Sequence, residues 1–366
     1  MNNEYYMRKA LILARRGLGK TSPNPMVGAL IVRDDRIIGQ GYHRHYGGNH
    51  AEINAIKDAR GRISGATLYV TLEPCCHHGK KTPPCLDALL KYNLGRVVIG
   101  TVDPNPQVNG RSIEVLRDRG IETEVGVLTE ECQRLNEAYF KYIQTGIPFV
   151  TLKFAQTLDG RIASATGDSR WISSTPSLKF AHKLRSFHDA VLVGVGTIQT
   201  DDPQLTVRLV KGRSPIRIVT DSRLRIALSS KVLKEQEVAR TIIAITSQAD
   251  SEKLSSLTQM GIEILSVEED TEGKVNLKDL LSKLGGMNIS SVLIEGGTAI
   301  ITSLIRQRLV DKYIVISAPK LMGKGIDAVG DLGILDVDSA LKLSFVKAYR
   351  NGQDLIIEAK PQVDEA

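Results

Sequence analysis

The chain lacks any hydrophobic run close to the roughly 20 residues that a helix needs to span a bilayer, so we expect no transmembrane segment. Its first six residues, MNNEYY, lack the basic-then-apolar plan of a secretory signal peptide. Cysteine is scarce, with four in 366 residues, and three of the four cluster near histidines. This usage argues against a disulfide framework and favours a metal site in a reducing compartment, so we expect a cytoplasmic protein.

No block of lysine or arginine stands out, although 48 basic and 41 acidic residues give a formal net charge of +7. Such a balance serves either nucleic acid or small phosphorylated ligands, and charge alone does not decide between them. The length allows two domains with separate cores. The 42% of hydrophobic residues is ordinary for a globular protein.

The stretch from residue 50 to residue 85 concentrates metal-binding side chains. His50 is followed two residues later by Glu52, and Cys75 and Cys85 each follow a proline. Zinc prefers thiolate and imidazole ligands, and three of them leave a fourth position for water. Glu52 is then a candidate to move protons without binding the metal. The pattern resembles the H-x-E…P-C-x-x-C signature of zinc nucleobase deaminases, except that nine residues separate the cysteines here.

A structural zinc site is the main alternative, and a disulfide is a weaker one. A structural site is usually closed by a fourth protein ligand, for which Cys76, His77 and His78 are nearby candidates. A closed site, however, gives no reason for Glu52 or for the two prolines that precede the ligand cysteines. We therefore favour a catalytic zinc.

The first half of the chain alternates helices and strands. We expect helices over residues 4–16, from about 50, from 84, over 112–119 and over 129–145, and strands over 29–32, 37–42, 66–72, 96–100 and 121–125. This order predicts a three-layer α/β/α domain, with Cys75 at the carboxyl end of a buried strand, where ligands collect. In a regular helix His50 and Glu52 would point about 200° apart, so both can face one site only at the first turn. Residues 146–148 are the best candidate for a domain junction.

The second half contains two junctions at which a strand runs into glycines and then a helix. The apolar strand 190–194 leads into Val195-Gly196-Thr197, and the strand 291–294 leads into Glu295-Gly296-Gly297. Glycines there let backbone amides approach phosphate, which suggests a nucleotide cofactor with several phosphates. The G-x-G-x-x-G fingerprint is absent at both, so an orthodox dinucleotide-binding fold is not expected. The alternative is that these glycines serve only helix packing.

Several motifs together resemble the bifunctional riboflavin-biosynthesis family, which joins a diaminohydroxyphosphoribosylaminopyrimidine deaminase to a 5-amino-6-(5-phosphoribosylamino)uracil reductase. The resemblance covers nearly the whole chain and rests on residues 23–25, 50–52, 71–75, 82–85, 103–106, 153–163, 171–173, 194–202 and 295–297. One departure is that Gly79-Lys80-Lys81-Thr82 is one lysine longer than the usual motif.

The resemblance implies a cytidine-deaminase-like α/β/α domain over residues 1–146 and a dihydrofolate-reductase-like α/β domain over residues 147–362. The first would use zinc to replace the ring amine of 2,5-diamino-6-ribosylamino-4(3H)-pyrimidinone 5′-phosphate by a carbonyl. The second would use NADPH to reduce the ribosyl side chain, giving 5-amino-6-ribitylamino-uracil 5′-phosphate. We expect a small phosphorylated substrate, no nucleic acid or membrane partner, and a homo-oligomer.

The resemblance also assigns residues. In the deaminase, His50, Cys75 and Cys85 would bind zinc, Glu52 would transfer protons, and the candidates for holding the substrate are Asn24, His43, Lys80 or Lys81, and Asn105. In the reductase, the cofactor would meet Ala155, Trp171, Thr197, Asp201, Ser222, Gly296, Gly297, Thr298, Ala299 and Ile300. The reductase substrate would meet Lys153, Ser169, Arg185, Leu205, Arg208 and Glu295, and the two arginines suit its phosphate.

Two other functions remain open from the sequence. One is a nucleotide or tRNA deaminase with an inactive reductase-like half. The other is a non-enzymatic zinc module that binds nucleic acid, which predicts a steep salt dependence and has no need of Glu52.

Overall fold

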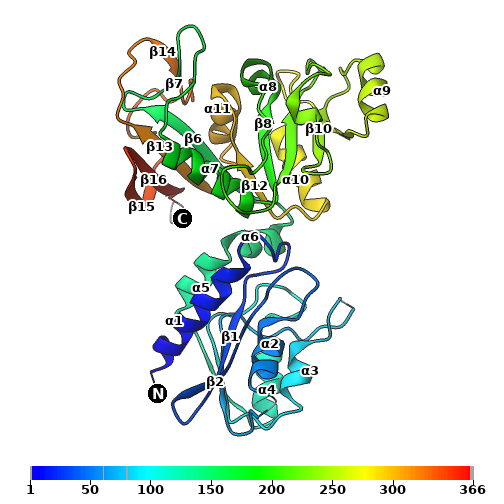
Figure 1. The fold of residues 1–366 in the computed structure, drawn as a ribbon, viewed down its shortest axis with the longest axis vertical. Helices are drawn as coiled ribbons and strands as arrows, with labels where there is room; N and C mark the ends of the chain where they lie inside the picture. Colours follow the sequence, from blue (N-terminus) through cyan, green and yellow to red (C-terminus); the bar gives the residue numbers. More distant parts are fainter. Residues whose placement is uncertain (1, 61, 80, 363–366) are drawn as a thin grey trace. The chain divides into compact units, whose positions relative to one another are not determined.

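The computed structural model describes residues 2–60, 62–79 and 81–362 (Figure 1). The chain divides into two compact units, Met1–Gly146 and Ile147–Ala366. Within the described ranges, no helix combines the length and the apolar character that a bilayer crossing requires.

The first unit contains a five-stranded sheet in the order β2-β1-β3-β4-β5. Strand β1 runs antiparallel to both of its neighbours, whereas β3, β4 and β5 are parallel. The strands are β1 (Gly28–Arg33), β2 (Arg36–Tyr42), β3 (Thr67–Val70), β4 (Arg96–Ile99) and β5 (Glu122–Val125). The helices are α1 (Asn3–Ala14), α2 (Ala51–Asp58), α3 (Cys85–Leu89), α4 (Arg111–Asp118), α5 (Thr129–Leu135) and α6 (Glu137–Thr145), with a 3₁₀ turn over Arg15–Gly17.

Helices cover both faces of this sheet, which confirms the three-layer prediction. Alternate residues of a strand face opposite sides: Ala29 and Ile31 pack into a cluster with α2, α3 and α4, while Leu30 and Val32 pack with α1 and Cys132 of α5. Figure 1 shows α1 and α5 on one side of the sheet and α2, α3 and α4 on the other. Helix α2 lies directly against β2, since a Cβ atom at Gly41 would come within 2.3 Å of the carbonyl oxygen of Ala51.

The prediction of a single helix over residues 129–145 is wrong, because the helix is interrupted at Asn136. This residue has φ −114° and ψ 26° and separates α5 from α6. Its side chain pairs with the backbone of Met26 from a distant loop. Asparagine side chains compete with regular helical bonding in this way, and helical periodicity carries no sign of such a long-range partner.

The second unit contains a nine-stranded sheet in the order β11-β10-β9-β8-β12-β6-β13-β16-β15. Its neighbouring strands are parallel from β11 through to β13, and β16 and β15 add an antiparallel edge. The strands are β6 (Phe149–Thr157), β8 (Ala190–Gly194), β9 (Ile216–Thr220), β10 (Thr241–Ile245), β11 (Glu263–Ser266), β12 (Ser291–Ile294), β13 (Lys312–Ala318), β15 (Leu343–Asn351) and β16 (Asp354–Pro361). A separate ribbon pairs β7 (Arg161–Ser164) with β14 (Gly325–Asp327).

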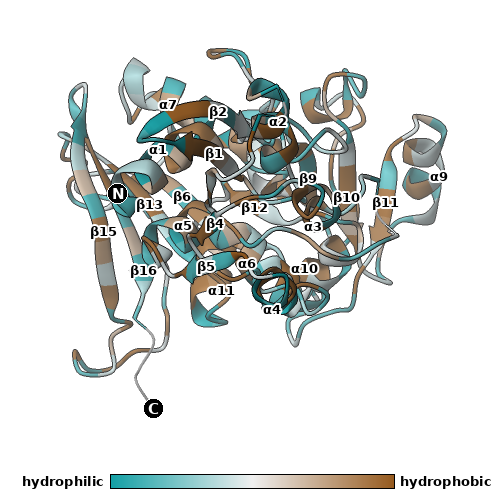
Figure 2. Cartoon of the chain, turned by 90° about the horizontal axis from the view of Figure 1, so that it is seen from below, coloured by the Kyte–Doolittle hydropathy of each residue, from teal (hydrophilic) through white to brown (hydrophobic). Residues whose placement is uncertain are grey.

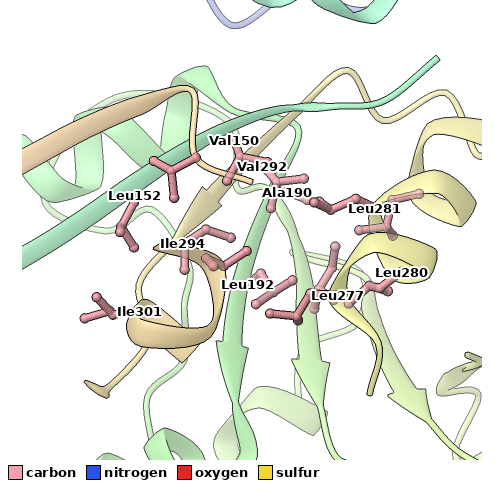
Figure 3. Packing of buried hydrophobic residues seen from close by; sticks show 14 of the residues in the cluster. Val150, Leu152, Ala190, Leu192, Leu277, Leu280, Leu281, Val292, Ile294 and Ile301 are labelled. Atoms are coloured by element: carbon pink, nitrogen blue, oxygen red, sulfur yellow. The ribbon is translucent and has the colours of Figure 1, made fainter. Parts of the chain in front are cut away.

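Buried strands and helices form the core of this unit. Strands such as β12 are brown, that is hydrophobic, in Figure 2. Figure 3 shows side chains of β6, β8 and β12 packed against Leu277, Leu280 and Leu281 of α10 and against Ile301 of α11. The helices are α7 (Thr175–Phe187), α8 (Val195–Asp201), α9 (Ser251–Gln259), α10 (Leu277–Gly286) and α11 (Thr298–Arg306), with a 3₁₀ turn over Lys231–Leu233.

The two predicted strand–glycine–helix junctions are confirmed. Gly194 is the N-cap of α8 and Gly297 is the N-cap of α11. The strands that precede them, β8 and β12, are parallel neighbours, so both junctions lie at the same edge of the sheet.

Candidate metal centre and glycine-lined cavity

The three predicted zinc ligands lie together. His50 is the N-cap of α2, Cys75 follows β3, and Cys85 is the first residue of α3. The Sγ atoms of Cys75 and Cys85 lie 3.4 and 3.3 Å from Nδ1 of His50. Bonds of about 2.3 Å to sulfur and about 2.0 Å to nitrogen, at tetrahedral angles, place those atoms roughly 3.5 Å apart. The residues therefore fit a zinc ion.

Contacts around the ligands favour the same metal. The hydroxyl of Thr82 lies 3.1 Å from Nε2 of His50, so a proton on Nε2 leaves Nδ1 free to bind metal. The backbone N–H of Cys85 donates to Sγ of Cys75 over 3.3 Å, which stabilises a thiolate. Among the described residues the group that could hold a metal comprises His50, Cys75 and Cys85, without the fourth ligand that a structural site needs.

Glu52 is buried beside this group, and only 3% of its surface is exposed. Within the described part of the chain, its Oε2 atom has no hydrogen-bond partner. Burial raises the pKa of the Glu52 carboxyl, and the neighbouring Cys75 raises it further. In a regular helix the side chains of His50 and Glu52 would point in nearly opposite directions. His50 instead lies just outside the helix, with extended φ and ψ angles of −70° and 167°, so this restriction does not apply. A buried, unpartnered carboxyl oxygen fits a water and a substrate that are bound during turnover.

Asn24 and His43 lie next to the metal ligands. Nδ2 of Asn24 is 3.2 Å from Nε2 of His43, and Nδ1 of His43 is 3.1 Å from the carbonyl oxygen of Asn49. The His43 ring meets the His50 ring edge-on at 5.1 Å between centroids. Burial lowers the pKa of His43, so the neutral ring donates from Nδ1 and accepts from Asn24.

The loop that carries Asn105 is held by two acidic residues. Asp103 Oδ1 accepts the backbone N–H of Asn105 over 2.9 Å. Glu73, for which the sequence predicted no role, accepts the N–H groups of Asp103 and Gly110 over 3.2 and 2.9 Å and the hydroxyl of Ser112 over 2.8 Å. Its position directly after a buried strand, as a charged residue in an apolar context, is the signal that could have identified it.

The predicted lysines differ in what the structure describes. Lys80 lies outside the described residues. The Nζ atom of Lys81 lies 4.4 Å from the ring centroid of Tyr46, which is a cation–π distance.

In the second unit a cavity of about 450 Å³ opens at the glycine junctions. Of the predicted cofactor and substrate residues, the cavity is lined by Lys153, Ala155, Ser169, Thr197, Asp201, Glu295, Gly296, Gly297, Thr298, Ala299 and Ile300. The remaining five predicted residues are not part of this lining: Trp171, Arg185, Leu205, Arg208 and Ser222.

A buried ion-pair network includes two residues that line this cavity, Lys153 and Glu295. Arg185 donates from Nε and Nη2 to the two oxygens of Glu295 over 2.7 and 2.9 Å, and Nζ of Lys153 is 3.9 Å from Glu295. Burial opposes ionisation of Glu295, but the charges of Arg185 and Lys153 outweigh it and lower its pKa to about 2. Burial lowers the pKa of Lys153. Arg185 also donates to the carbonyl oxygen of Thr206 over 3.1 Å.

Two other predicted reductase residues, Trp171 and Arg208, have contacts outside this network. Trp171 is 66% exposed, and its carbonyl accepts from Lys320 over 2.6 Å. The backbone N–H of Arg208 donates to Nδ1 of His182 over 2.9 Å. The sequence did not point to His182, because a histidine in the middle of an amphipathic helix carries no signal of its own.

Leu205 and Ser222 have structural contacts. Leu205 is buried in a cluster with residues of β8 and β9. Ser222 Oγ accepts the backbone N–H of Val275 over 3.0 Å.

Comparison with known proteins decides the family. The family model described as "RibD C-terminal domain" matches residues 148–357, and the "Cytidine and deoxycytidylate deaminase zinc-binding region" matches residues 1–101. Riboflavin biosynthesis protein RibD of Aquifex aeolicus (strain VF5) is 45% identical over 96% of both chains. The chain belongs to the RibD family. RibD of Escherichia coli (strain K12) is 38% identical over 98% of this chain and 99% of its own.

Solved structures agree with the RibD assignment. Acinetobacter baumannii RibD superposes with a TM-score of 0.89 at 34% identity over 99% of both chains. A diaminohydroxyphosphoribosylaminopyrimidine deaminase/5-amino-6-(5-phosphoribosylamino)uracil reductase from Thermotoga maritima gives a TM-score of 0.86 at 38% identity, over 98% of this chain and 99% of its own.

Membership of the RibD family confirms the main predictions. The chain is a bifunctional deaminase and reductase of riboflavin biosynthesis, with a zinc-binding, cytidine-deaminase-like domain followed by a dihydrofolate-reductase-like domain. The non-enzymatic alternative is wrong.

Proposed function

We propose that residues 1–146 deaminate 2,5-diamino-6-ribosylamino-4(3H)-pyrimidinone 5′-phosphate and that residues 147–362 then reduce its ribosyl chain with NADPH. The product would be 5-amino-6-ribitylamino-uracil 5′-phosphate. The observation that carries the first step is the ligand group of His50, Cys75 and Cys85 beside a buried Glu52 oxygen without a partner among the described residues. The name of the Thermotoga maritima relative supports deamination before reduction, because it gives a diaminopyrimidine as the deaminase substrate and a uracil as the reductase substrate.

Glu52 is the proton-transfer residue of the deaminase. His50, Cys75 and Cys85 would hold a zinc ion, which would supply the Lewis acidity that activates water at neutral pH. Glu52 would carry one proton of the attacking water to the ring nitrogen and then the second proton to the leaving amine, so that the water oxygen becomes the carbonyl oxygen and ammonia departs.

We expect four positions to hold the pyrimidine and its phosphate: Asn24, His43, Lys80 or Lys81, and Asn105. The neutral His43 ring accepts from the Asn24 amide and so fixes which way that amide points. Lysine supplies positive charge for the phosphate.

In the reductase, NADPH would supply the hydride. The chain contributes orientation and charge. The backbone at the α8 and α11 junctions, together with Ala155, Thr197, Asp201 and residues 296–300, faces the cavity and would hold the cofactor phosphates. Trp171 and Ser222 complete the proposed cofactor contacts.

The reductase substrate would lie beside the buried network. Lys153, Ser169 and Glu295 line the cavity and suit hydrogen bonds to the ribosyl chain. Leu205, Arg185 and Arg208 are the remaining proposed substrate contacts. Because Arg185 already pairs with both oxygens of Glu295, Arg208 is the better candidate for binding the phosphate.

We also expect the protein to form a homo-oligomer in the cytoplasm. Strand β15 is the edge of its sheet, and Phe345 is 77% exposed there; Figure 2 shows brown segments along this strand. An exposed apolar edge strand favours pairing with another chain. Light scattering should give a multiple of the 40.1 kDa chain mass, and a monomer would contradict this part.

Mass spectrometry of the product from the diamino-pyrimidinone ribosyl phosphate tests both steps. We expect an amine-for-oxygen exchange without NADPH, and two further hydrogens only when NADPH is present. Deamination of cytidylate or tRNA in place of this substrate would overturn the substrate assignment and leave the zinc chemistry in place.

A further inference from the structure

Asn136, at the break between α5 and α6, is joined to a loop 110 residues away. The backbone N–H of Met26 donates to Oδ1 of Asn136 over 2.8 Å, and Nδ2 of Asn136 donates to the carbonyl oxygen of Met26 over 2.9 Å. The Asn136 side chain is buried, with 3% of its surface exposed. The amide thus satisfies both backbone groups of Met26, as a neighbouring strand would.

Tyr139, one turn further along, is joined to a second loop. Its hydroxyl donates to Oδ1 of Asp103 over 2.8 Å, and the same oxygen accepts the backbone N–H of Asn105. Burial raises the pKa of Asp103 to about 6 and raises the pKa of Tyr139 as well. The hydroxyl proton therefore stays on Tyr139, which remains a donor at neutral pH.

These two residues connect one helix to two of the loops that carry proposed substrate contacts. Asn24 lies two positions before Met26, and Asn105 lies two positions after Asp103. Asn136 is the N-cap of α6 and Tyr139 lies in the first turn of that helix, so both anchors are at the same helix end. Because Asn136 lies between the two helices, its side-chain amide can reach the backbone of Met26.

We propose that Asn136 and Tyr139 are positioning residues for deaminase substrate binding, acting through Asn24 and Asn105. The inference rests on the proposed function of the first unit. The metal ligands and Glu52 are placed by α2, β3 and α3 instead. Loss of either anchor should therefore weaken substrate binding and leave the metal and the proton transfer intact.

Loss of either anchor should weaken substrate binding only partly, because other contacts also hold each loop. Glu73 accepts the backbone N–H of Asp103, and the N–H of Asn24 donates to the carbonyl oxygen of Thr21 over 2.9 Å. One lost hydrogen bond of ordinary strength then corresponds to about a tenfold change in affinity.

The experiment uses Tyr139→Phe, which removes only the hydroxyl, and Asn136→Leu, which removes both hydrogen bonds at similar volume. Deaminase KM and kcat, zinc content and reductase KM are measured on the full chain. We expect deaminase KM to rise about tenfold for Tyr139→Phe and more for Asn136→Leu. Deaminase kcat and reductase KM should stay within about twofold of the parent values. The zinc content should remain one ion per chain.

Tyr69→Phe is the matched control. It removes another tyrosine hydroxyl of the same unit, which donates to Asn3 over 3.0 Å, and should leave deaminase KM unchanged. Failure of Asn136→Leu to fold leaves Tyr139→Phe as the decisive variant. An unchanged KM in Tyr139→Phe overturns the proposal, as does a fall in zinc content or an equal loss of both activities. If the parent chain does not deaminate the pyrimidine at all, the proposed function fails first.

Discussion

Arg185 and Glu295 form a bidentate ion pair that links α7 to the end of β12, with donor–acceptor distances of 2.7 and 2.9 Å. Their side chains are only 12% and 10% exposed. Burial of such a pair costs desolvation, and the loss of one partner leaves a buried charge without compensation. The pair therefore contributes to the stability of the second unit, and it also holds Glu295 in place at the edge of the cavity.

Stability of the second unit should fall in acid because of Glu295. Its pKa is about 2 in the folded state, below the ordinary value of 4.5. A group whose folded pKa is lowered contributes stability that is complete above about pH 4.5 and is lost as the pH falls towards 2. Urea unfolding of the full chain between pH 6 and pH 3 should show this loss.

Glu295→Gln is the control for this pH dependence, since it removes the titrating group. The variant should be less stable than the parent at pH 7, by roughly 3–5 kcal/mol, because Arg185 keeps a buried charge. Its unfolding should also depend less on pH. A pH dependence as steep as that of the parent would show that other carboxyls dominate.

Glu52→Gln should abolish deamination and spare everything else. The amide cannot accept a proton from water, so we expect kcat to fall by about 10²–10⁴. Zinc content, measured by atomic emission, should remain one per chain, and NADPH-dependent reduction of the deaminated substrate should be unchanged. Normal turnover in this variant would remove Glu52 from the mechanism.

Thr82→Val should weaken zinc binding without removing a ligand. The hydroxyl contacts Nε2 of His50, and loss of such an outer contact typically costs about 10–100-fold in metal affinity. Competition with a chromophoric chelator measures the change. Thr82→Ser retains the hydroxyl and should behave as the parent; equal zinc affinity in all three proteins would contradict the role of Thr82.

Arg208→Ala should raise the KM for the reductase substrate far more than the KM for NADPH. A guanidinium that binds phosphate contributes about 1.5–3 kcal/mol, which corresponds to roughly ten- to a hundredfold in KM. Because Trp171 is the single tryptophan of the chain, its fluorescence can follow NADPH binding independently of turnover. The reverse ranking of the two KM values would move Arg208 to the cofactor side.

Local chemistry made much of this protein predictable from its sequence. Few side chains bind zinc, so His50, Cys75 and Cys85 could be identified from type and spacing. Apolar runs located the strands, and glycines after two of them located the cavity edge in the second unit. These features depend on neighbours in the chain or on a short motif, and the sequence records them directly.

Only the tertiary structure decided how distant segments meet. The break at Asn136, the contact of Tyr139 with Asp103, the anchoring by Glu73 and the bond from Arg208 to His182 each join residues that are far apart in the chain. Periodicity reports which face of an element is apolar, but it does not name the partner across the core. The sequence by itself indicated the ligands and the chemistry of this protein; the packing of helices on the first sheet determined which loops those ligands face.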